Sequence, residues 1–121
     1  MTEEKPIIWV KSSLEDLKDL PQKPKRDIGF ALSEVQEGEY PYNAKPLSGS
    51  DLKGVYEIRV DADSNTYRAA YAVNLGNYIF VLHVFQKKSK KGISTPKKDM
   101  DVIRSRLKLA QEMAKELDNE R

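Results

Sequence analysis

Apolar residues recur at spacings of three and four in three stretches of the chain, and each stretch predicts a helix. The first follows Ser12, which opens a capping-box pattern. The second begins near Pro24 and ends at Gly38, a residue typical of the position after a helix. These two helices are expected to form a hairpin with a proline-containing turn. The third is an amphipathic helix of about 20 residues, with Thr95 as its N-cap and Pro96 as its first residue.

Alternation of apolar and polar residues predicts strands in the middle of the chain. Residues 55–61 and 66–73 alternate, and residues 78–86 are apolar throughout, which is typical of a central strand covered on both faces. Turn residues separate the three runs, so we expect an antiparallel meander. A short β-rich run at 7–10 precedes the helices. Residues 39–54 are expected to form a loop because they are rich in turn-forming residues.

The element order is therefore β-α-α-β-β-β-α, which predicts a single α+β domain. The chain has 121 residues, enough for one domain over 1–121, and we expect residues from about 118–121 to form a disordered tail. The N-terminus is polar, and no apolar run reaches the ~18 residues that a membrane span needs. We therefore expect a cytoplasmic protein without a membrane partner.

Composition removes several kinds of chemistry. The chain has no cysteine, which excludes disulfides, a thiol nucleophile and cysteine-ligated zinc or iron–sulfur sites. It has one histidine and no cluster of aspartates, so we expect no metal site. It also lacks the glycine-rich motifs that bind nucleotide phosphates, and no small-molecule cofactor is expected.

Positive charge is concentrated in one part of the sequence. Residues 51–98 hold nine Lys and Arg against four Asp and Glu, a net charge of +5, whereas the rest of the chain carries −3. A basic segment in a nearly neutral protein favours a local surface for a polyanion such as RNA. The alternative is an ordinary solvated loop rich in lysine.

Strand alternation sorts the side chains of the predicted meander between two faces. One face is expected to pack against helices, and it carries Tyr56, Ile58, Val60, Tyr67, Ala69, Tyr71 and Val73. The other face carries Glu57, Arg59 and Arg68, with Lys87 at the rim, and also His83 if the third strand presents its odd-numbered residues there. An exposed carboxylate beside arginines could take a proton from a ribose 2′-hydroxyl. The cations could bind phosphate and stabilise the charged phosphorane formed during cleavage.

Each of these residues also has a purely structural interpretation. Glu57 and Arg59 are suitable salt-bridge partners on a solvated face, and Arg68 is a suitable edge charge. His83 is flanked by apolar residues, which is typical of a half-buried structural histidine. The lysine run after the third strand is typical of a solvated loop. The residues alone leave these alternatives open.

Five segments of the sequence, in order and spacing, resemble the phage-derived HigB-like branch of the RelE/ParE toxin superfamily. They are Lys45-Pro46-Leu47-Ser48-Gly49, Gly54-Val55-Tyr56-Glu57-Ile58-Arg59, Tyr67-Arg68-Ala69-Ala70-Tyr71, Leu82-His83-Val84-Phe85-Gln86-Lys87-Lys88 and Thr95-Pro96. The resemblance extends over about residues 7–118. It implies a RelE/ParE-like fold, in which an antiparallel sheet is combined with an N-terminal helical hairpin and a C-terminal helix.

The resemblance also implies the toxin of a type II toxin–antitoxin system. Such a toxin would act as a ribosome-dependent, metal-independent mRNA endoribonuclease that inhibits translation, and its partners would be a small helix-turn-helix antitoxin (HigA-like) and mRNA on the ribosome. Carried over to this sequence, the catalytic residues would be Arg59 and Arg68, which bind phosphate, with Lys87 and with Glu57 as a base or an arginine orienter. The RNA-binding residues would be Lys53, Lys88, Lys90, Lys91 and His83.

Two other functions remain open at this point. Some branches of the superfamily inhibit DNA gyrase without cutting RNA. The chain could also be a phage-derived binding module without toxicity.

Overall fold

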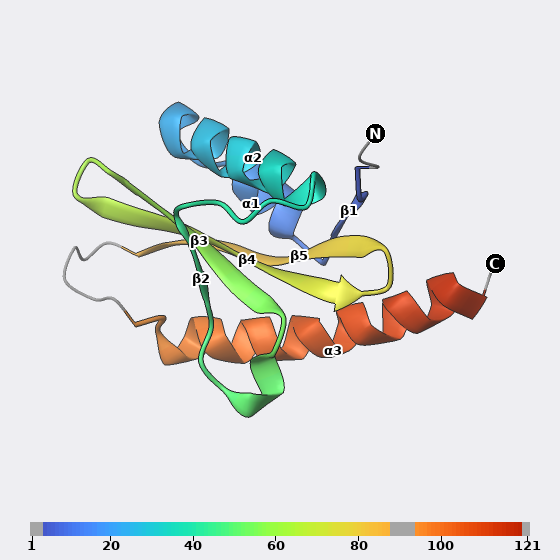
Figure 1. Ribbon diagram of the computed structural model, residues 1–121. Helices are drawn as coiled ribbons and strands as arrows, with labels where there is room; N and C mark the ends of the chain where they lie inside the picture. The colour runs from blue at the N-terminus through green and yellow to red at the C-terminus, as the bar shows by residue number, and fades with distance from the viewer. Residues whose placement is uncertain (1–3, 88–93, 120–121) are drawn as a thin grey trace.

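The fold is a five-stranded sheet between two layers of helix. The computed structural model describes residues 4–87 and 94–119. In Figure 1, α1 and α2 lie on one side of the sheet and α3 crosses its other side. The elements in chain order are β1 (Ile7–Trp9), α1 (Ser13–Lys18), α2 (Gln22–Gln36), β2 (Ala44–Pro46), the short 3-10 helix η1 (Ser50–Leu52), β3 (Val55–Ala62), β4 (Asn65–Leu75), β5 (Tyr78–Lys87) and α3 (Lys97–Asn119).

The strand order in the sheet is β1-β5-β4-β3-β2. β3, β4 and β5 form the antiparallel meander that the alternation predicts. β1 pairs in parallel with β5, so the whole sheet is mixed. β2 pairs with β3, although residues 39–54 are predicted as a loop. Three residues are too few to show a period, and this strand forms because β3 offers it a hydrogen-bonding edge.

The two N-terminal helices form the predicted hairpin, and α2 ends where Gly38 predicts. Gly38 has a φ of 86°, in the left-handed region that glycine adopts at low cost. The amide of Gly38 donates to the Val35 carbonyl, and the amide of Glu39 donates to the Glu34 carbonyl. These two bonds form a Schellman motif, which satisfies carbonyl groups at the end of the helix.

The predicted N-cap of α1 is confirmed in position but not in its side-chain bond, and the predicted start of α3 is wrong by one residue. The Ser12 hydroxyl makes no capping bond to the backbone of α1 and donates instead to the Asp16 carboxylate at 2.8 Å. α3 begins one residue later than predicted, because the Pro96 carbonyl accepts the first helical bond, from the Met100 amide. The Thr95 hydroxyl is thereby free to bond elsewhere, and it reaches the sheet.

The apolar stripe predicted for α3 is confirmed. Its buried members are Ile103, Leu107, Ala110 and Ala114, and Leu117 packs against them. The helix continues to Asn119, so residues 118–119 of the expected disordered tail are helical, and 120–121 lie outside the described residues.

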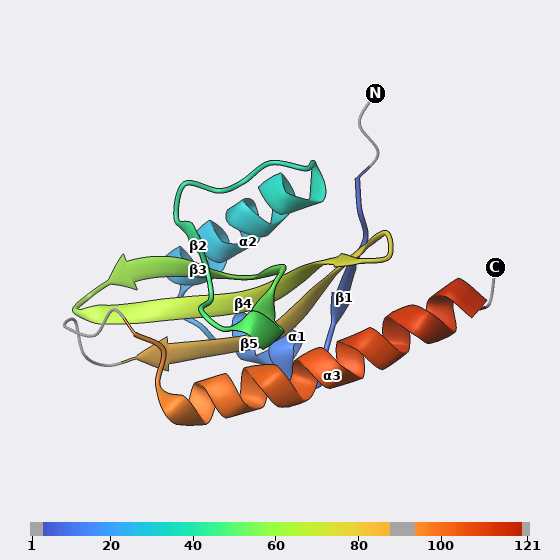
Figure 2. The ribbon, with the colours of Figure 1, turned by 60° about the horizontal axis from the view of Figure 1, so that its bottom comes forward.

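Strand alternation divides the buried side chains into two cores. The core under α1 and α2 contains the predicted helix-facing residues of the meander, including Ile58, Tyr67 and Tyr71. The core under α3 contains the opposite face, including Val55 and Ala70. Figure 2 shows α3 running along this second face. The helix therefore covers the apolar part of that face, and the charged part lies beside the start of the helix.

Candidate functional site

The charged part of the sheet is organised around the carboxylate of Glu57. Its Oε1 atom accepts hydrogen bonds from Arg59 Nε at 2.8 Å and from Arg68 Nη1 at 3.4 Å. Its Oε2 atom accepts a hydrogen bond from the Thr95 hydroxyl at 2.9 Å. The strand register explains the first two contacts, because Arg59 and Arg68 are direct cross-strand partners in β3 and β4. The third contact joins the sheet to the segment that enters α3.

Glu57 and Arg68 are buried in this network, with relative exposures of 0% and 1%. The expectation of an exposed carboxylate is therefore wrong, because Thr95 and the start of α3 lie over the face that alternation alone leaves open to water. Burial lowers the pKa of Arg68 from its usual value, and the nearby Glu57 carboxylate opposes that shift. Charged groups buried at this depth require close partners of opposite charge, and Glu57 and Arg68 provide this for each other.

Arg59 occupies a different environment from Arg68. Its side chain is 22% exposed and lines a surface pocket of about 260 Å³. The other lining residues are Pro46, Leu47, Ser48, Ser94, Thr95 and Met100. The pocket thus combines a guanidinium and three hydroxyl groups with apolar walls. Such a site can bind an anionic group through the guanidinium and pack a flat or apolar group against the walls.

This pocket brings together segments that are far apart in the sequence. The Lys45–Gly49 segment supplies one wall, the strand motif that ends at Arg59 supplies the guanidinium, and Thr95 comes from the entry to α3. Arg68, from a fourth segment, is linked to the pocket through Glu57 and through a contact of 3.5 Å from its Nη1 to the Thr95 hydroxyl. Three of the five segments that carry the resemblance therefore line this pocket, and a fourth is linked to it through Arg68.

His83 is on the same face of the sheet, as predicted if β5 presents odd-numbered residues there. The pairing of Ala70 with His83 places the imidazole there, whereas the register shift after Ala70 turns the odd-numbered residues Ile79 and Val81 toward the other core. The imidazole stacks on Phe85 with ring centroids 4.7 Å apart.

Both ring nitrogens of His83 face the protein interior. Nε2 lies 2.8 Å from an Asp99 oxygen in the first turn of α3. Nδ1 is buried and makes no hydrogen bond within the described residues. His83 is not among the lining residues of the Arg59 pocket. Its contacts instead fasten β5 to the start of α3.

The predicted lysines are not gathered at one point. Lys87 donates to the Ser94 carbonyl at 3.0 Å, which places it beside the pocket residue Ser94. Lys53 lies near one end of β4, because the carbonyl of the next residue, Gly54, accepts a hydrogen bond from the Val73 amide. Lys87 lies near the other end of β4, where it pairs with Thr66. The structure therefore separates Lys53 from Lys87. Three further predicted RNA-binding residues, Lys88, Lys90 and Lys91, lie outside the described residues.

Sequence reasoning missed two residues that bond to predicted site residues, Thr95 to Glu57 and Asp99 to His83. Thr95 was assigned to capping α3, and its contact with Glu57 spans 38 positions in the chain. Asp99 reads as an ordinary acidic residue in the first turn of a helix. Thr95 lies within one of the segments that carry the resemblance, and this position indicates a functional role for the residue. The sequence does not indicate which side chain Thr95 contacts.

Within residues 4–87 and 94–119, no group of three His, Asp or Glu side chains is arranged to hold a metal ion. In the same residues, no helix is both long and apolar enough to span a membrane.

The fold and the arginine pocket fit the class that the sequence comparison identifies. Residues 15–108 match the family model described as phage-derived protein Gp49-like (DUF891). This match covers most of the chain, so the chain belongs to the Gp49-like family, which is a RelE/ParE-like toxin family. No curated protein matches the sequence.

Proposed function

We propose that this protein is the HigB-like toxin of a type II toxin–antitoxin system and that it cleaves mRNA on the ribosome in the cytoplasm. The observation that carries the proposal is that three separated segments line the pocket that contains Arg59, and that Arg68 of a fourth segment bonds to Glu57 and Thr95 behind it. Membership of the Gp49-like family supports the toxin assignment. A toxin of this kind requires a neutralising partner, and we assign that role to a helix-turn-helix, HigA-like antitoxin.

In the proposed reaction, Arg59 binds the scissile phosphate. The Glu57 carboxylate holds the guanidinium through its Nε, and the guanidinium borders the pocket. A guanidinium fixed in this way can bind two phosphate oxygens and stabilise the additional negative charge of the phosphorane. Because its orientation is set before the substrate arrives, little reorganisation is needed during the reaction.

The nucleophile is the ribose 2′-hydroxyl next to the scissile phosphate. Its oxygen bonds to phosphorus while the bond from phosphorus to the 5′-oxygen of the next nucleotide breaks. The hydroxyl proton leaves the nucleophile and a proton is gained by the departing 5′-oxygen. The products are a 2′,3′-cyclic phosphate and a 5′-hydroxyl.

The buried Glu57 serves in this proposal as an orienting residue for the arginines. Its two oxygens already accept bonds from Arg59, Arg68 and Thr95, and its exposure is 0%. We assign RNA-backbone contacts to Lys87 and to the lysines that follow it in the sequence, and an indirect role in fixing the start of α3 to His83.

The test is to map mRNA ends after adding purified protein to translating ribosomes. The wild-type protein should produce new ends within the translated region, and Arg59→Ala should reduce their yield at least about a hundredfold, the scale on which one transition-state contact acts. Arg26→Ala is the matched control, because Arg26 is an exposed arginine on α2, on the other side of the sheet. It should cleave like the wild type.

Unchanged cleavage by Arg59→Ala would overturn the site assignment. Intact mRNA together with inhibition of DNA supercoiling would favour the non-catalytic gyrase inhibitor. Unimpaired bacterial growth with abundant folded protein would favour a binding module without toxicity.

A further inference from the structure

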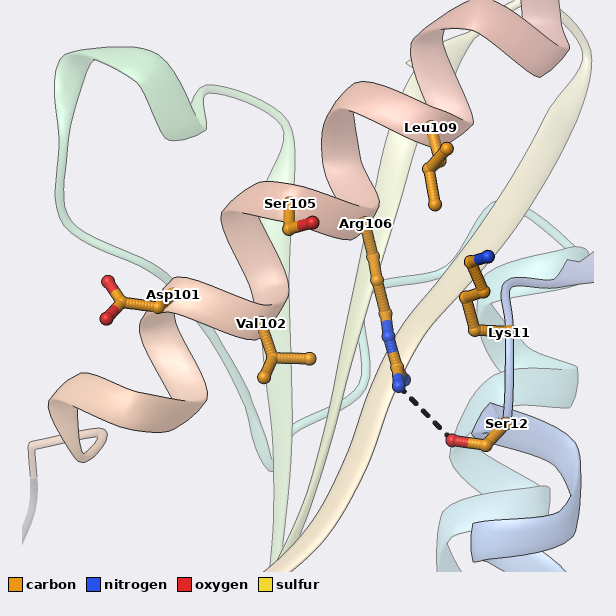
Figure 3. Close-up of a pocket in the computed structure, with 7 residues that line it drawn as sticks. All are labelled: Lys11, Ser12, Asp101, Val102, Ser105, Arg106 and Leu109. Carbon is orange, nitrogen blue, oxygen red and sulfur yellow. Dashed lines mark hydrogen bonds between the residues drawn. The ribbon is translucent and has the colours of Figure 1, made fainter.

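A second hollow of about 590 Å³ lies on the other flank of α3, away from the Arg59 pocket. Figure 3 shows α3 on one side and the chain between β1 and α1 on the other. The lining includes Lys11, Ser12, Val102, Ser105, Arg106 and Leu109. At 100° per residue, the α3 members Val102, Ser105 and Leu109 form one stripe, and Met100, which lines the Arg59 pocket, lies on the opposite side of the helix. We call this hollow the α3 groove.

The walls of the α3 groove are held together by Arg106. Its Nη1 donates to the Leu82 carbonyl in β5 at 2.9 Å, and its Nη2 donates to the Ser12 hydroxyl at 3.2 Å. Ser12 in turn donates to Asp16 in α1 at 2.8 Å. One side chain thus ties α3 to the sheet and to α1, as the dashed line in Figure 3 shows for Ser12. The groove is therefore formed before any partner binds.

Lys11 gives the groove a second cation at a position where lysine is conformationally costly. Its φ of 53° lies in the left-handed region, which costs a non-glycine residue about 1 kcal/mol or more. The side chain is exposed, and it lies on the wall that faces α3. A strained residue whose charged side chain borders a preformed hollow indicates a use for that charge.

The lining favours a partner with both acidic and aliphatic side chains. Lys11 and Arg106 are cationic, and Val102 and Leu109 supply apolar surface beside them. The acidic residue of the lining, Asp101, is paired with Lys97 at 2.9 Å. The surplus positive charge therefore faces a hollow with an apolar wall. Nucleic acid would use the cations and leave the aliphatic surface unused, whereas an acidic amphipathic peptide would use both.

We propose that the α3 groove binds an acidic amphipathic segment of the neutralising antitoxin. This inference rests on the proposed toxin function for the identity of the partner. It assigns the partner to a surface on the opposite flank of α3 from the Arg59 pocket, so the segment would bind without filling the pocket. Carboxylates of the segment would pair with Lys11 and Arg106, and its aliphatic side chains would pack on Val102 and Leu109.

The probe for the test is a synthetic peptide of about 12 residues, with leucines at helical spacing and glutamates elsewhere. Titrated into isotope-labelled protein at millimolar concentration, it should shift the amide NMR signals of the groove residues, and the shifts should weaken as NaCl rises from about 50 mM to about 500 mM. A matched peptide with lysine in place of glutamate should leave these signals unchanged.

Lys11→Gly is the decisive variant, because glycine adopts the left-handed conformation without strain and the variant should fold at least as well as the wild type. It should weaken binding of the glutamate peptide by about threefold to fivefold, the effect of losing one exposed ion pair. Lys23→Gln, on the exposed surface of α2, is the control and should bind the peptide like the wild type.

Equal binding by Lys11→Gly and wild type, equal binding of the lysine peptide, or shifts confined to other surfaces would each overturn the proposal. Displacement of the glutamate peptide by a short oligouridylate would assign the groove to RNA instead. Lys11→Gly should still cleave mRNA. Cleavage without peptide binding would therefore reject the groove alone, and peptide binding without cleavage by the wild type would reject the nuclease function alone.

Discussion

Arg59 and Arg68 are cross-strand partners in the β3–β4 ladder, and both donate to the same oxygen of Glu57. The two arginines differ in their access to solvent. Arg59 is 22% exposed and borders the pocket, whereas Arg68 is 1% exposed. Arg59 is therefore available to a substrate, whereas Arg68 holds the buried Glu57 carboxylate in place.

This difference predicts that Arg68→Ala is mainly a stability variant. Removing the Arg68 guanidinium leaves the buried Glu57 carboxylate with less compensation, and we expect the free energy of unfolding to fall by about 3 kcal/mol. Arg59→Ala removes a partly solvated partner and should cost about 1 kcal/mol. Urea unfolding followed by circular dichroism measures both. An Arg68→Ala protein as stable as the wild type would contradict the assigned role.

Thr95 should contribute to both stability and activity through its hydroxyl. Thr95→Val keeps the size of the side chain but removes the bond to Glu57 Oε2. We expect a loss of about 2 kcal/mol, typical of a hydrogen bond to a charged group, and a lower rate of mRNA cleavage. Thr95→Ser keeps the hydroxyl and should restore most of both properties.

The two Thr95 variants distinguish positioning from simple packing. If the methyl group were the important feature, Thr95→Val would behave like the wild type and Thr95→Ser would be the defective variant. Unfolding in urea and end-mapping of cleaved mRNA on the same preparations would reveal that pattern.

Tyr71 should make the fold sensitive to alkali. Burial raises the pKa of its hydroxyl well above the usual value, with smaller contributions from Tyr40 and Tyr56. Above about pH 10 the unfolded chain loses this proton and the folded chain retains it, so the unfolded state binds fewer protons and stability falls as pH rises. Tyr71→Phe should show a shallower loss of unfolding free energy between about pH 9 and about pH 11. Identical slopes for the two proteins would argue against it.

Two glycines should respond in opposite directions to replacement by alanine. Gly54 has a φ of 82°, and an added Cβ would lie 3.0 Å from the Val73 carbonyl oxygen, so Gly54→Ala should cost about 1–2 kcal/mol. Gly29 lies inside α2 with nothing within 4 Å of an added Cβ. Gly29→Ala should therefore stabilise the protein by about 0.5–1 kcal/mol. Thermal unfolding of both variants measures whether each substitution raises or lowers the stability of the protein.

Features of the fold set by local periodicity were predictable from the sequence. The alternation that separates Ile58 from Glu57 and Arg59 identified both faces of the sheet, because each strand imposes that period on its own residues. The stripe that includes Ile28 and Leu32 identified the buried face of α2 for the same reason. β2 was not predicted because this strand forms mainly through its pairing with β3, which no local pattern in its three residues indicates.

The environment of the candidate site was less predictable than its residues. Alternation places Glu57 on the correct face but contains no information about what covers that face. The cover comes from Thr95, 38 positions away, and the partner of His83 comes from Asp99 in another element. Contacts between distant segments depend on how the layers pack, and a single sequence does not encode them in any local pattern.

The edges of the sheet have a consequence for how the protein behaves in a crowded cell. Each edge strand, β1 or β2, is three residues long, and β2 ends in Pro46, which has no amide hydrogen to donate. β1 pairs with residues 79–81 of β5 and β2 with residues 56–58 of β3, so a strand from another molecule would find few free backbone groups at these parts of the sheet edge. Growth into an intermolecular sheet is therefore hindered at β1 and β2 and would have to begin at residues 83–87 of β5 or residues 60–62 of β3.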